Sequence, residues 1–334
     1  MRHATAIPLP AAVPATSVVT PATTVVIPAT TVVIPAKAGI HLLLLLATLT
    51  LSLPARALNV FACEPEWGAL LAELGGDRLD TFVATSALQD VHQIEARPSL
   101  IAKLRRADLV VCTGADLEVG WLPQLVRQAG NARVASGTGS FMAAAQVTTL
   151  ERPTTLDRAA GDIHPQGNPH VQLDPHRVLA IADALAARLV ELDPGNAALY
   201  QARLVDFSTR WQAAIARWEA RAAPLKGRKV VVHHGSWVYL LAWLGMQQIG
   251  TLEPKPGVPA TSAHLASLVA LAKDSDTLAI LRAAYQDPKP ADWLSERTGV
   301  PALTLPYTVG GDAQAKDLFG LFDSTLDKLL GAAR

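Results

Sequence analysis

The sequence predicts an α/β fold with two parallel-sheet lobes, joined by a long rigid helix and separated by a cleft. Short apolar segments with a strand pattern alternate with segments of helical spacing through residues 58–135. The same alternation returns in residues 229–330, and a helical stretch lies between the two regions. Alternating strands and helices favour parallel sheets covered by helices, and a cleft between two lobes is suited to a ligand.

The first lobe is expected over residues 58–175. Its predicted strands cover residues 58–63, 79–84, 108–112 and 132–135, and its predicted helices cover 67–74, 99–107 and 122–129. Gly75-Gly76 is a stop signal for the first helix, and Pro98 lies at the start of the second. Cys63 and Cys112 end two strands and are expected to be buried free thiols, because disulfides between adjacent strands are uncommon and strained.

A helical region is expected over residues 176–226, and the second lobe over residues 227–334. Asp174 and Pro175 suit the cap and first turn of a helix over residues 178–192. After a break at residues 193–196, one long helix covers residues 197–223. The second lobe has predicted strands at 229–232, 248–252, 277–282 and 302–305, and predicted helices at 237–244, 261–273, 291–298 and 317–330.

Residues 1–57 are predicted to lie outside the fold. Lys37 precedes a leucine-rich run over residues 42–53, and Ala55-Arg56-Ala57 follows, which is the order of a signal peptide cleaved after Ala57. The run is about 12 residues long, short of the roughly 20 that span a bilayer, so an uncleaved anchor is the less favoured alternative. Residues 21–34 repeat Pro-Ala-Thr-Thr-Val-Val-Ile, which we interpret as a dispensable extension.

The leader bears on where the protein is expected to reside. A lipoprotein would need Cys63 as its lipidated residue, but Arg56 and Asn59 interrupt the apolar context before it. We therefore expect a periplasmic protein that is soluble rather than lipid-anchored.

The charge balance also changes when the leader is removed. The whole chain has a net charge of zero, but residues 1–57 contain three basic and no acidic residues. Residues 58–334 therefore carry 26 basic and 29 acidic residues, a net charge of −3. The lack of a basic excess argues against nucleic-acid binding, and two cysteines cannot form a disulfide framework or a Cys-rich zinc module.

Three histidines and one carboxylate follow predicted strands or precede a predicted helix. His92 lies in the loop after the second strand, His170 lies before the helix capped by Asp174, and His234 ends the strand at 229–232. Asp287 follows the strand at 277–282. Ligands of open α/β sheets bind beyond the carboxyl ends of the strands. Three imidazoles and a carboxylate suit tetrahedral Zn²⁺, although the carboxylate is also compatible with Mn²⁺ or Fe²⁺.

Several stretches of residues 58–334 resemble the zinc- and manganese-binding solute-binding proteins of bacterial ABC transporters. The matching stretches are Asp90-Val91-His92 with Ala96-Arg97-Pro98-Ser99; Ala107-Asp108-Leu109-Val110-Val111-Cys112-Thr113-Gly114 with Leu117-Glu118 and Trp121-Leu122; Asn168-Pro169-His170-Val171-Gln172-Leu173-Asp174-Pro175; and Val231–Trp237 with Tyr239-Leu240. Together these stretches are specific, whereas each alone would be weak.

This resemblance implies a ligand set. The three histidines of the family fall on His92, His170 and His234, the last in preference to His233. The carboxylate falls on Asp287, with Glu95 and Glu253 as competitors. This chain departs from the family by having Val91 in place of a proline and by lacking a His-rich loop before His170. His164 alone remains there and is an alternative, labile extra ligand.

The resemblance also implies a function. We expect an extracytoplasmic protein that captures a divalent metal, Zn²⁺ ahead of Mn²⁺, and delivers it to the membrane permease of an ABC transporter. Four protein ligands would close the site to catalysis, and neither His-Glu-x-x-His nor Gly-x-Ser-x-Gly occurs. A secreted zinc hydrolase and a metal-independent receptor or adhesin are the alternatives. We expect a monomer that does not bind nucleic acid.

Overall fold

The computed structural model describes residues 57–153, 161 and 164–333. The chain divides into two compact units, Met1–Pro54 and Ala55–Arg334, and only the second contains described residues. The predicted signal peptide and the repeat within it therefore lie outside the described residues, apart from Ala57. Among the described helices, none is both long and apolar enough to cross a membrane.

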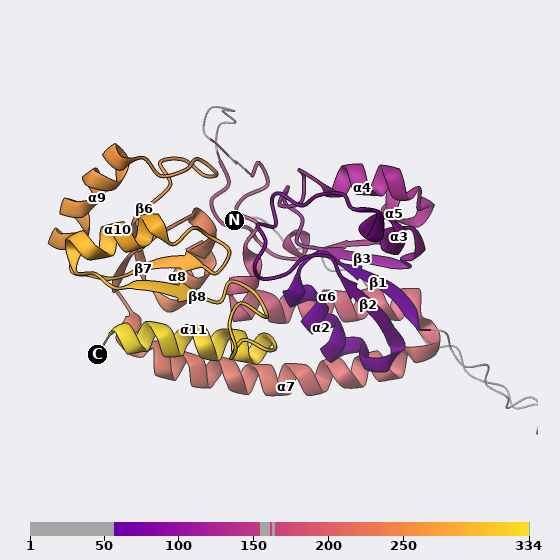
Figure 1. Ribbon diagram of the computed structural model, residues 1–334. Helices are drawn as coiled ribbons and strands as arrows, with labels where there is room; N and C mark the ends of the chain where they lie inside the picture. The colour runs from indigo at the N-terminus through magenta and orange to yellow at the C-terminus, as the bar shows by residue number, and fades with distance from the viewer. Residues whose placement is uncertain (1–56, 154–160, 162–163, 334) are drawn as a thin grey trace, which may run out of the picture. The chain divides into compact units, whose positions relative to one another are not determined.

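The first sheet is parallel, with its strands in the order β2-β1-β3-β4. The strands are β1 (Leu58–Ala62), β2 (Leu79–Val83), β3 (Leu109–Cys112) and β4 (Ser140–Met142). The helices are α2 (Pro65–Gly75), α3 (Pro98–Arg106), α4 (Leu122–Ala129) and α5 (Ala132–Ala135). Phe61 and Val110 pack in one apolar cluster with α3 and α4, while Val60 and Val111 pack in another with α2. This alternation shows that both faces of the sheet are covered, as in Figure 1.

The predicted strand at residues 132–135 is wrong. These residues form the short helix α5, and the fourth strand is instead β4, at 140–142. The side chain of Asn131 caps α5 by accepting a hydrogen bond from Arg133 N, and its amide donates to the carbonyls of Leu104 and Ala107. This fixes a turn of helix that the apolar pattern alone does not indicate.

The second sheet is also parallel and has the equivalent strand order, β6-β5-β7-β8. Its strands are β5 (Lys229–Val232), β6 (Gln247–Thr251), β7 (Thr277–Ala283) and β8 (Ala302–Leu305). Its helices are α8 (Val238–Leu244), α9 (Ser262–Asp274), α10 (Lys289–Thr298) and α11 (Leu318–Ala332). Val231 and Ile280 pack with residues of α9 and α10, whereas Val232 and Leu281 join the same core as the first lobe.

Two helices connect the lobes, α6 (Pro175–Leu192) and α7 (Ala197–Ala222). Figure 1 shows α7 running along both lobes, beside α2 of the first and α11 of the second. Trp211 Nε1 donates to the Pro175 carbonyl, and Trp218 Nε1 donates to Asp323 of α11, each at 2.8 Å. Arg210 of α7 is paired with Glu73 of α2. The helix is therefore fixed to both lobes.

One apolar core continues from the first lobe through α6 and α7 into the second. It includes Val60 and Trp67 of the first lobe, Trp211 of α7, and Leu281 and Phe322 of the second lobe. Separating the lobes widely would expose this apolar surface to water. The shared core therefore favours small relative motions over a wide hinge.

The two cysteines form a disulfide, so the expectation of free thiols is wrong. Cys63 follows β1 and Cys112 ends β3, which is the neighbouring strand in the sheet, and their Cα atoms are 4.8 Å apart. Both side chains are fully buried. The strand order brings them within the ordinary Cα range for a disulfide, so the general rarity of bonds between adjacent strands does not hold at this pair.

Candidate metal centre

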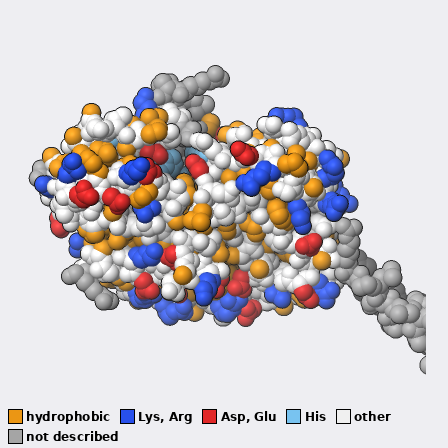
Figure 2. Space-filling view, viewed as in Figure 1, with side chains coloured by type: hydrophobic (Ala, Val, Ile, Leu, Met, Phe, Trp, Pro, Cys, Tyr) orange, Lys and Arg blue, Asp and Glu red, His pale blue; other side chains and the backbone are white. Residues whose placement is uncertain are grey.

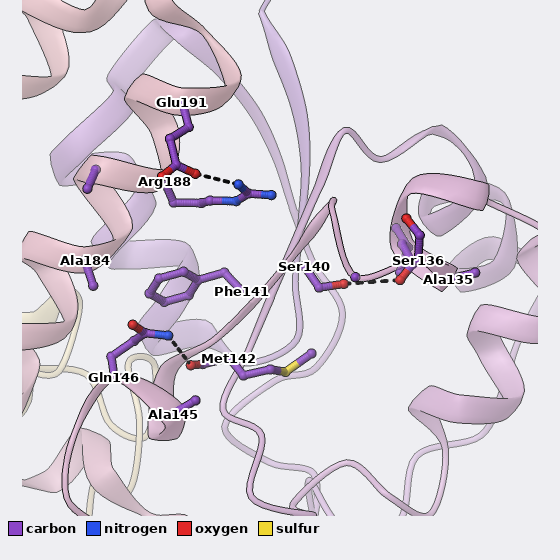
Figure 3. Close-up of a pocket in the computed structure, with 13 residues that line it drawn as sticks. Ala135, Ser136, Ser140, Phe141, Met142, Ala145, Gln146, Ala184, Arg188 and Glu191 are labelled. Carbon is purple, nitrogen blue, oxygen red and sulfur yellow. Dashed lines mark hydrogen bonds and ion pairs between the residues drawn. The ribbon is translucent and has the colours of Figure 1, made fainter.

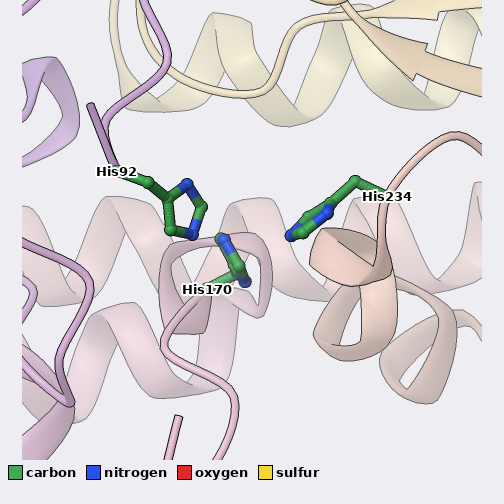
Figure 4. A group of neighbouring side chains, drawn as sticks. All are labelled: His92, His170 and His234. Carbon is green, nitrogen blue, oxygen red and sulfur yellow. The ribbon is translucent and has the colours of Figure 1, made fainter. Parts of the chain in front are cut away.

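Three histidines from separate segments converge between the lobes. His92 comes from the loop after β2, His170 from the residue before the 3-10 turn Val171–Leu173 that leads into α6, and His234 from the end of β5. One ring nitrogen of each lies within 4.8 Å of one ring nitrogen of the others, and Figure 4 shows the rings turned toward a common point. Histidine surface is visible in the hollow between the lobes in Figure 2.

Each of these imidazoles is oriented by an oxygen atom that contacts its Nδ1. Nδ1 of His92 lies 2.8 Å from Asp90 Oδ1, and Nδ1 of His170 lies 2.7 Å from Asn168 Oδ1. Nδ1 of His234 lies 2.7 Å from Glu253 Oε2. An oxygen at Nδ1 favours the tautomer whose proton is on Nδ1 and leaves Nε2 with a free lone pair.

The free ring nitrogens have the properties expected of metal ligands. Nε2 of His92 and Nε2 of His170 are buried and have no hydrogen-bond partner. Burial holds the pKa of His170 well below its usual range, with His92 and His234 adding to the effect. A buried acceptor without a partner is costly, and a neutral imidazole is the form that binds metal. The donor set therefore fits a divalent transition metal.

His92 and His170 are positioned by the same local motif. In each case an Asx residue two positions earlier accepts hydrogen bonds from both the backbone N and the ring of the histidine. Trp121 Nε1 also donates to the Val91 carbonyl at 2.9 Å and fixes the loop beside His92. These orienting roles of Asp90 and Asn168 were not predicted, although both residues precede a histidine with the spacing Asx-x-His.

Glu253 orients a histidine in this structure and does not belong to the group of three. One carboxylate oxygen accepts from the His234 ring and, at 2.9 Å, from Gly257 N. Burial would raise the pKa of Glu253, but the hydrogen bond and the charge of His234 outweigh it, so that the pKa is lowered. Glu253 is thus held as a carboxylate that stabilises the Nδ1 proton of His234.

Asp287 is not brought together with the three histidines. It is exposed, and its Oδ1 accepts a hydrogen bond from Lys289 N at 3.1 Å, where α10 begins. Glu95, the other competing carboxylate, is also exposed. His164 lies closer to the group: its ring centroid is 5.5 Å from that of His92 and 6.2 Å from that of His170.

Three glutamates are buried at the carboxyl end of the first sheet. Glu64 and Glu118 accept hydrogen bonds from Thr113 N, and Glu66 accepts one from the Thr308 hydroxyl of the second lobe. Burial raises the pKa of Glu66 to about 7 and that of Glu118 to about 6. Burial, together with Glu118, raises the pKa of Glu64 well above its usual range. Protons are therefore held in the interior near neutral pH.

One cavity lies away from the histidines. It is a groove of about 740 Å³ between α6 and the β4 region (Figure 3), and Arg188 and Glu191, both of α6, pair in its lining. Its lining contains no histidine. The cavity therefore lacks the nitrogen donors of the metal centre.

Comparison with known proteins identifies the class. The family described as "zinc-uptake complex component A periplasmic" matches residues 60–332. The manganese ABC transporter substrate-binding lipoprotein PsaA of Streptococcus anginosus is 21% identical over 280 residues, which cover 81% of this chain and 88% of the relative.

Solved structures agree in fold. A crystal structure of ZnuA matches with a TM-score of 0.71 at 23% identity, covering 83% of this chain and all of the other. The substrate-binding protein FpvC of Pseudomonas aeruginosa, in complex with Mn²⁺, also has a TM-score of 0.71, at 22% identity, covering 83% of this chain and 98% of FpvC.

The fold, the histidine cluster and these matches define a substrate-binding protein of a metal ABC transporter. The chain belongs to the ZnuA family, whose members are transport proteins and not enzymes. The resemblance found in the sequence, and the expectation of two parallel-sheet lobes with a long connecting helix, are confirmed.

The expectation of a soluble protein without a lipid anchor is contradicted by this comparison. The relative in Streptococcus anginosus is named a lipoprotein, and further streptococcal relatives have the same word in their names. The expectation was based on the apolar context before Cys63, most of which lies outside the described residues. Local sequence context was an insufficient basis for deciding on an anchor.

Proposed function

We propose that the protein captures a divalent transition metal, Zn²⁺ in preference to Mn²⁺, and delivers it to an ABC permease. His92, His170 and His234 are the proposed ligands, each binding through Nε2. The observation that carries this proposal is that all three rings have Nδ1 against an oxygen and Nε2 toward a shared point. That arrangement is typical of metal-binding histidines.

The donor set supports the preference for zinc. Imidazole suits Zn²⁺, whereas Mn²⁺ favours carboxylate, carbonyl and water oxygens. Two carboxylates near the histidines, Asp90 and Glu253, contact the Nδ1 side of the rings. Asp287 is outside the group of three histidines, and its Oδ1 accepts a hydrogen bond from Lys289 N.

Ligands from both lobes link metal binding to the relation between the lobes. His92 belongs to the first lobe and His234 to the second, so that a bound metal ties the two together. The shared core limits the motion that accompanies binding. A permease would then distinguish loaded protein from empty protein by modest changes at the rim of the cleft.

Metal stoichiometry of the purified protein tests this proposal. We expect one Zn²⁺ per chain in the wild type and none in His92→Ala or His234→Ala. His176→Ala is the matched control, because His176 is exposed and contacts Glu219 away from the site. Metal retained by both site variants would overturn the proposal, and turnover of an ester or peptide by the loaded protein would favour a hydrolase instead.

A further inference from the structure

His164 is a fourth imidazole at the metal centre that the three-histidine group leaves out. It lies shortly before His170, in the stretch of chain between β4 and α6. Its ring is tilted by 36° to that of His92 and by 88° to that of His170, so it is stacked on neither. A fourth ring at this distance raises the question of whether it can share a metal with the others.

The distances between ring centres can be compared with those expected around one metal ion. With Zn–N bonds of about 2.05 Å, each ring centre lies roughly 3.2 Å from the metal, and two rings at the tetrahedral angle lie ~5.2 Å apart. The three rings of the group are 5.6 to 5.9 Å apart. The His164 ring is 5.5 Å from that of His92 and 6.2 Å from that of His170, which is close to the spacing within the group, although its nitrogens lie outside the group of three in this structure.

The polar atoms of His164 also lack a partner. Both ring nitrogens of His164 are buried without a hydrogen-bond partner of good geometry, although the Ala115 backbone interacts with the ring. A buried nitrogen without a partner costs about 1–3 kcal/mol. Unlike the other three rings, His164 has no hydrogen bond of good geometry with a side-chain oxygen, so its ring is held less firmly.

Described backbone positions near His164 contact the loop after β6 and the turn before His170. Gly161 has a φ of +93°, and a Cβ there would lie 2.3 Å from the Pro256 carbonyl oxygen, so Gly161 packs closely on the loop after β6. That loop includes Gly257, whose N donates to Glu253, the partner of His234. The His164 carbonyl accepts from Gly167 N at 2.9 Å.

We propose that His164 is the fourth ligand, and that it gives the site an all-imidazole sphere that selects Zn²⁺ over Mn²⁺. This inference rests on the proposed function. An all-nitrogen set suits zinc, whereas a carboxylate in the fourth position would admit manganese. Specificity is thus set by the segment before His170 and not by Asp287.

Zn²⁺ and Mn²⁺ affinities, measured by competition with a chelator, test the proposal on four variants of the full chain. His164→Ala is expected to lose at least tenfold in Zn²⁺ affinity with little change for Mn²⁺. His164→Asp is expected to bring the two affinities closer, and Asp287→Ala and the control His176→Ala are expected to leave the ratio unchanged. Substituted Co²⁺ gives a second readout, because loss of a tetrahedral nitrogen ligand changes its visible absorption.

The outcomes separate this inference from the proposed function. An unchanged ratio of Zn²⁺ to Mn²⁺ affinity and an unchanged Co²⁺ spectrum in His164→Ala would overturn the role of His164. A change of ratio in Asp287→Ala alone would assign the fourth position to that carboxylate and overturn it equally. The proposed function fails by a different result, namely a wild type that binds no metal or a His92→Ala variant that retains it.

Discussion

The two lobes have the same strand order but position their metal ligands by different means. In the second lobe, His234 lies two residues after the end of β5, so the strand places it and Glu253 orients its ring. In the first lobe, His92 lies in a loop well beyond β2 and depends on Asp90 and on the bond from Trp121 to Val91. A ligand on a loop therefore needs more supporting contacts than a ligand at the end of a strand.

The interiors of the lobes differ as well. The first lobe contains the disulfide between β1 and β3 and the buried Glu64, Glu66 and Glu118. Glu66 also contacts Thr308, so its protonation state affects an interface between the lobes. The two lobes therefore combine one strand order with very different polar interiors, and substitutions in each lobe test this difference.

The largest expected effect is equal in both lobes. Zinc at a thousandfold excess over its Kd should stabilise the wild type by about 4 kcal/mol. His92→Ala and His234→Ala should each lose most of this stabilisation, because each removes one proposed ligand. Thermal unfolding with and without zinc measures it. A variant that keeps the full zinc-induced shift in unfolding temperature would show that its lobe does not contribute a ligand to the site.

The disulfide should stabilise the first lobe and leave the ligands of the second unaffected. Replacing both Cys63 and Cys112 by serine should lower the free energy of unfolding by about 2–4 kcal/mol, since the bond closes a loop of 49 residues. Urea unfolding of the variant and of the wild type gives the difference. Equal midpoints for the oxidised wild type and the double variant would contradict a stabilising bond.

The orienting oxygens should matter more for the ligand on the loop. Asp90→Ala removes both the backbone and the ring contact of His92 and should weaken zinc binding by about 10- to 100-fold. Glu253→Gln should cost less, because its amide oxygen still accepts from His234. Zinc titration measures both, and a greater loss in Glu253→Gln would reverse the proposed ranking of the two lobes.

The smallest predicted effect concerns pH. Burial raises the pKa of Glu66 to about 7, so the native protein retains a proton that the unfolded chain loses above about pH 4.5. This contribution lowers stability as pH rises from about 4.5 to 7. Glu66→Gln keeps an acceptor for Thr308 but has no such proton, and at pH 8 we expect it to be more stable by on the order of 1 kcal/mol.

The control for this prediction is the same comparison at acid pH. At pH 4.5 the wild-type carboxyl is protonated in the native state, so the gain from Glu66→Gln should shrink. A gain that is independent of pH would show that the substitution acts through packing and not through the proton. Denaturant unfolding at the two pH values separates these outcomes.

Much of the fold could be predicted from the pattern of apolar residues in the sequence. The strands at 229–232 and 302–305 have the predicted bounds, as does the helix at 122–129, because each contains its own pattern and stop signal. The segment at 132–135 was mispredicted because contacts of Asn131 with residues distant in the chain decide its conformation. The disulfide was missed because bonds between adjacent strands are uncommon in general, whereas here β1 and β3 do bring Cys63 to Cys112.

The site was accessible in part. The motif and the strand ends led to His92, His170 and His234, which the structure brings together. The oxygens at Nδ1 were not found, because they depend on ring orientation. The position of Asp287 at the start of α10 was not foreseen either. An Asp that follows a strand can accept a hydrogen bond from a backbone N at the start of a helix as readily as it can bind a metal.

X-ray absorption at the zinc edge of the loaded wild-type protein directly tests whether His92, His170 and His234 bind the metal. If these histidines bind the metal, we expect a shell of nitrogen atoms at about 2.0–2.1 Å, with the outer scattering of at least three imidazole rings. A first shell dominated by oxygen, with scattering from fewer than three rings, would contradict a centre built from His92, His170 and His234.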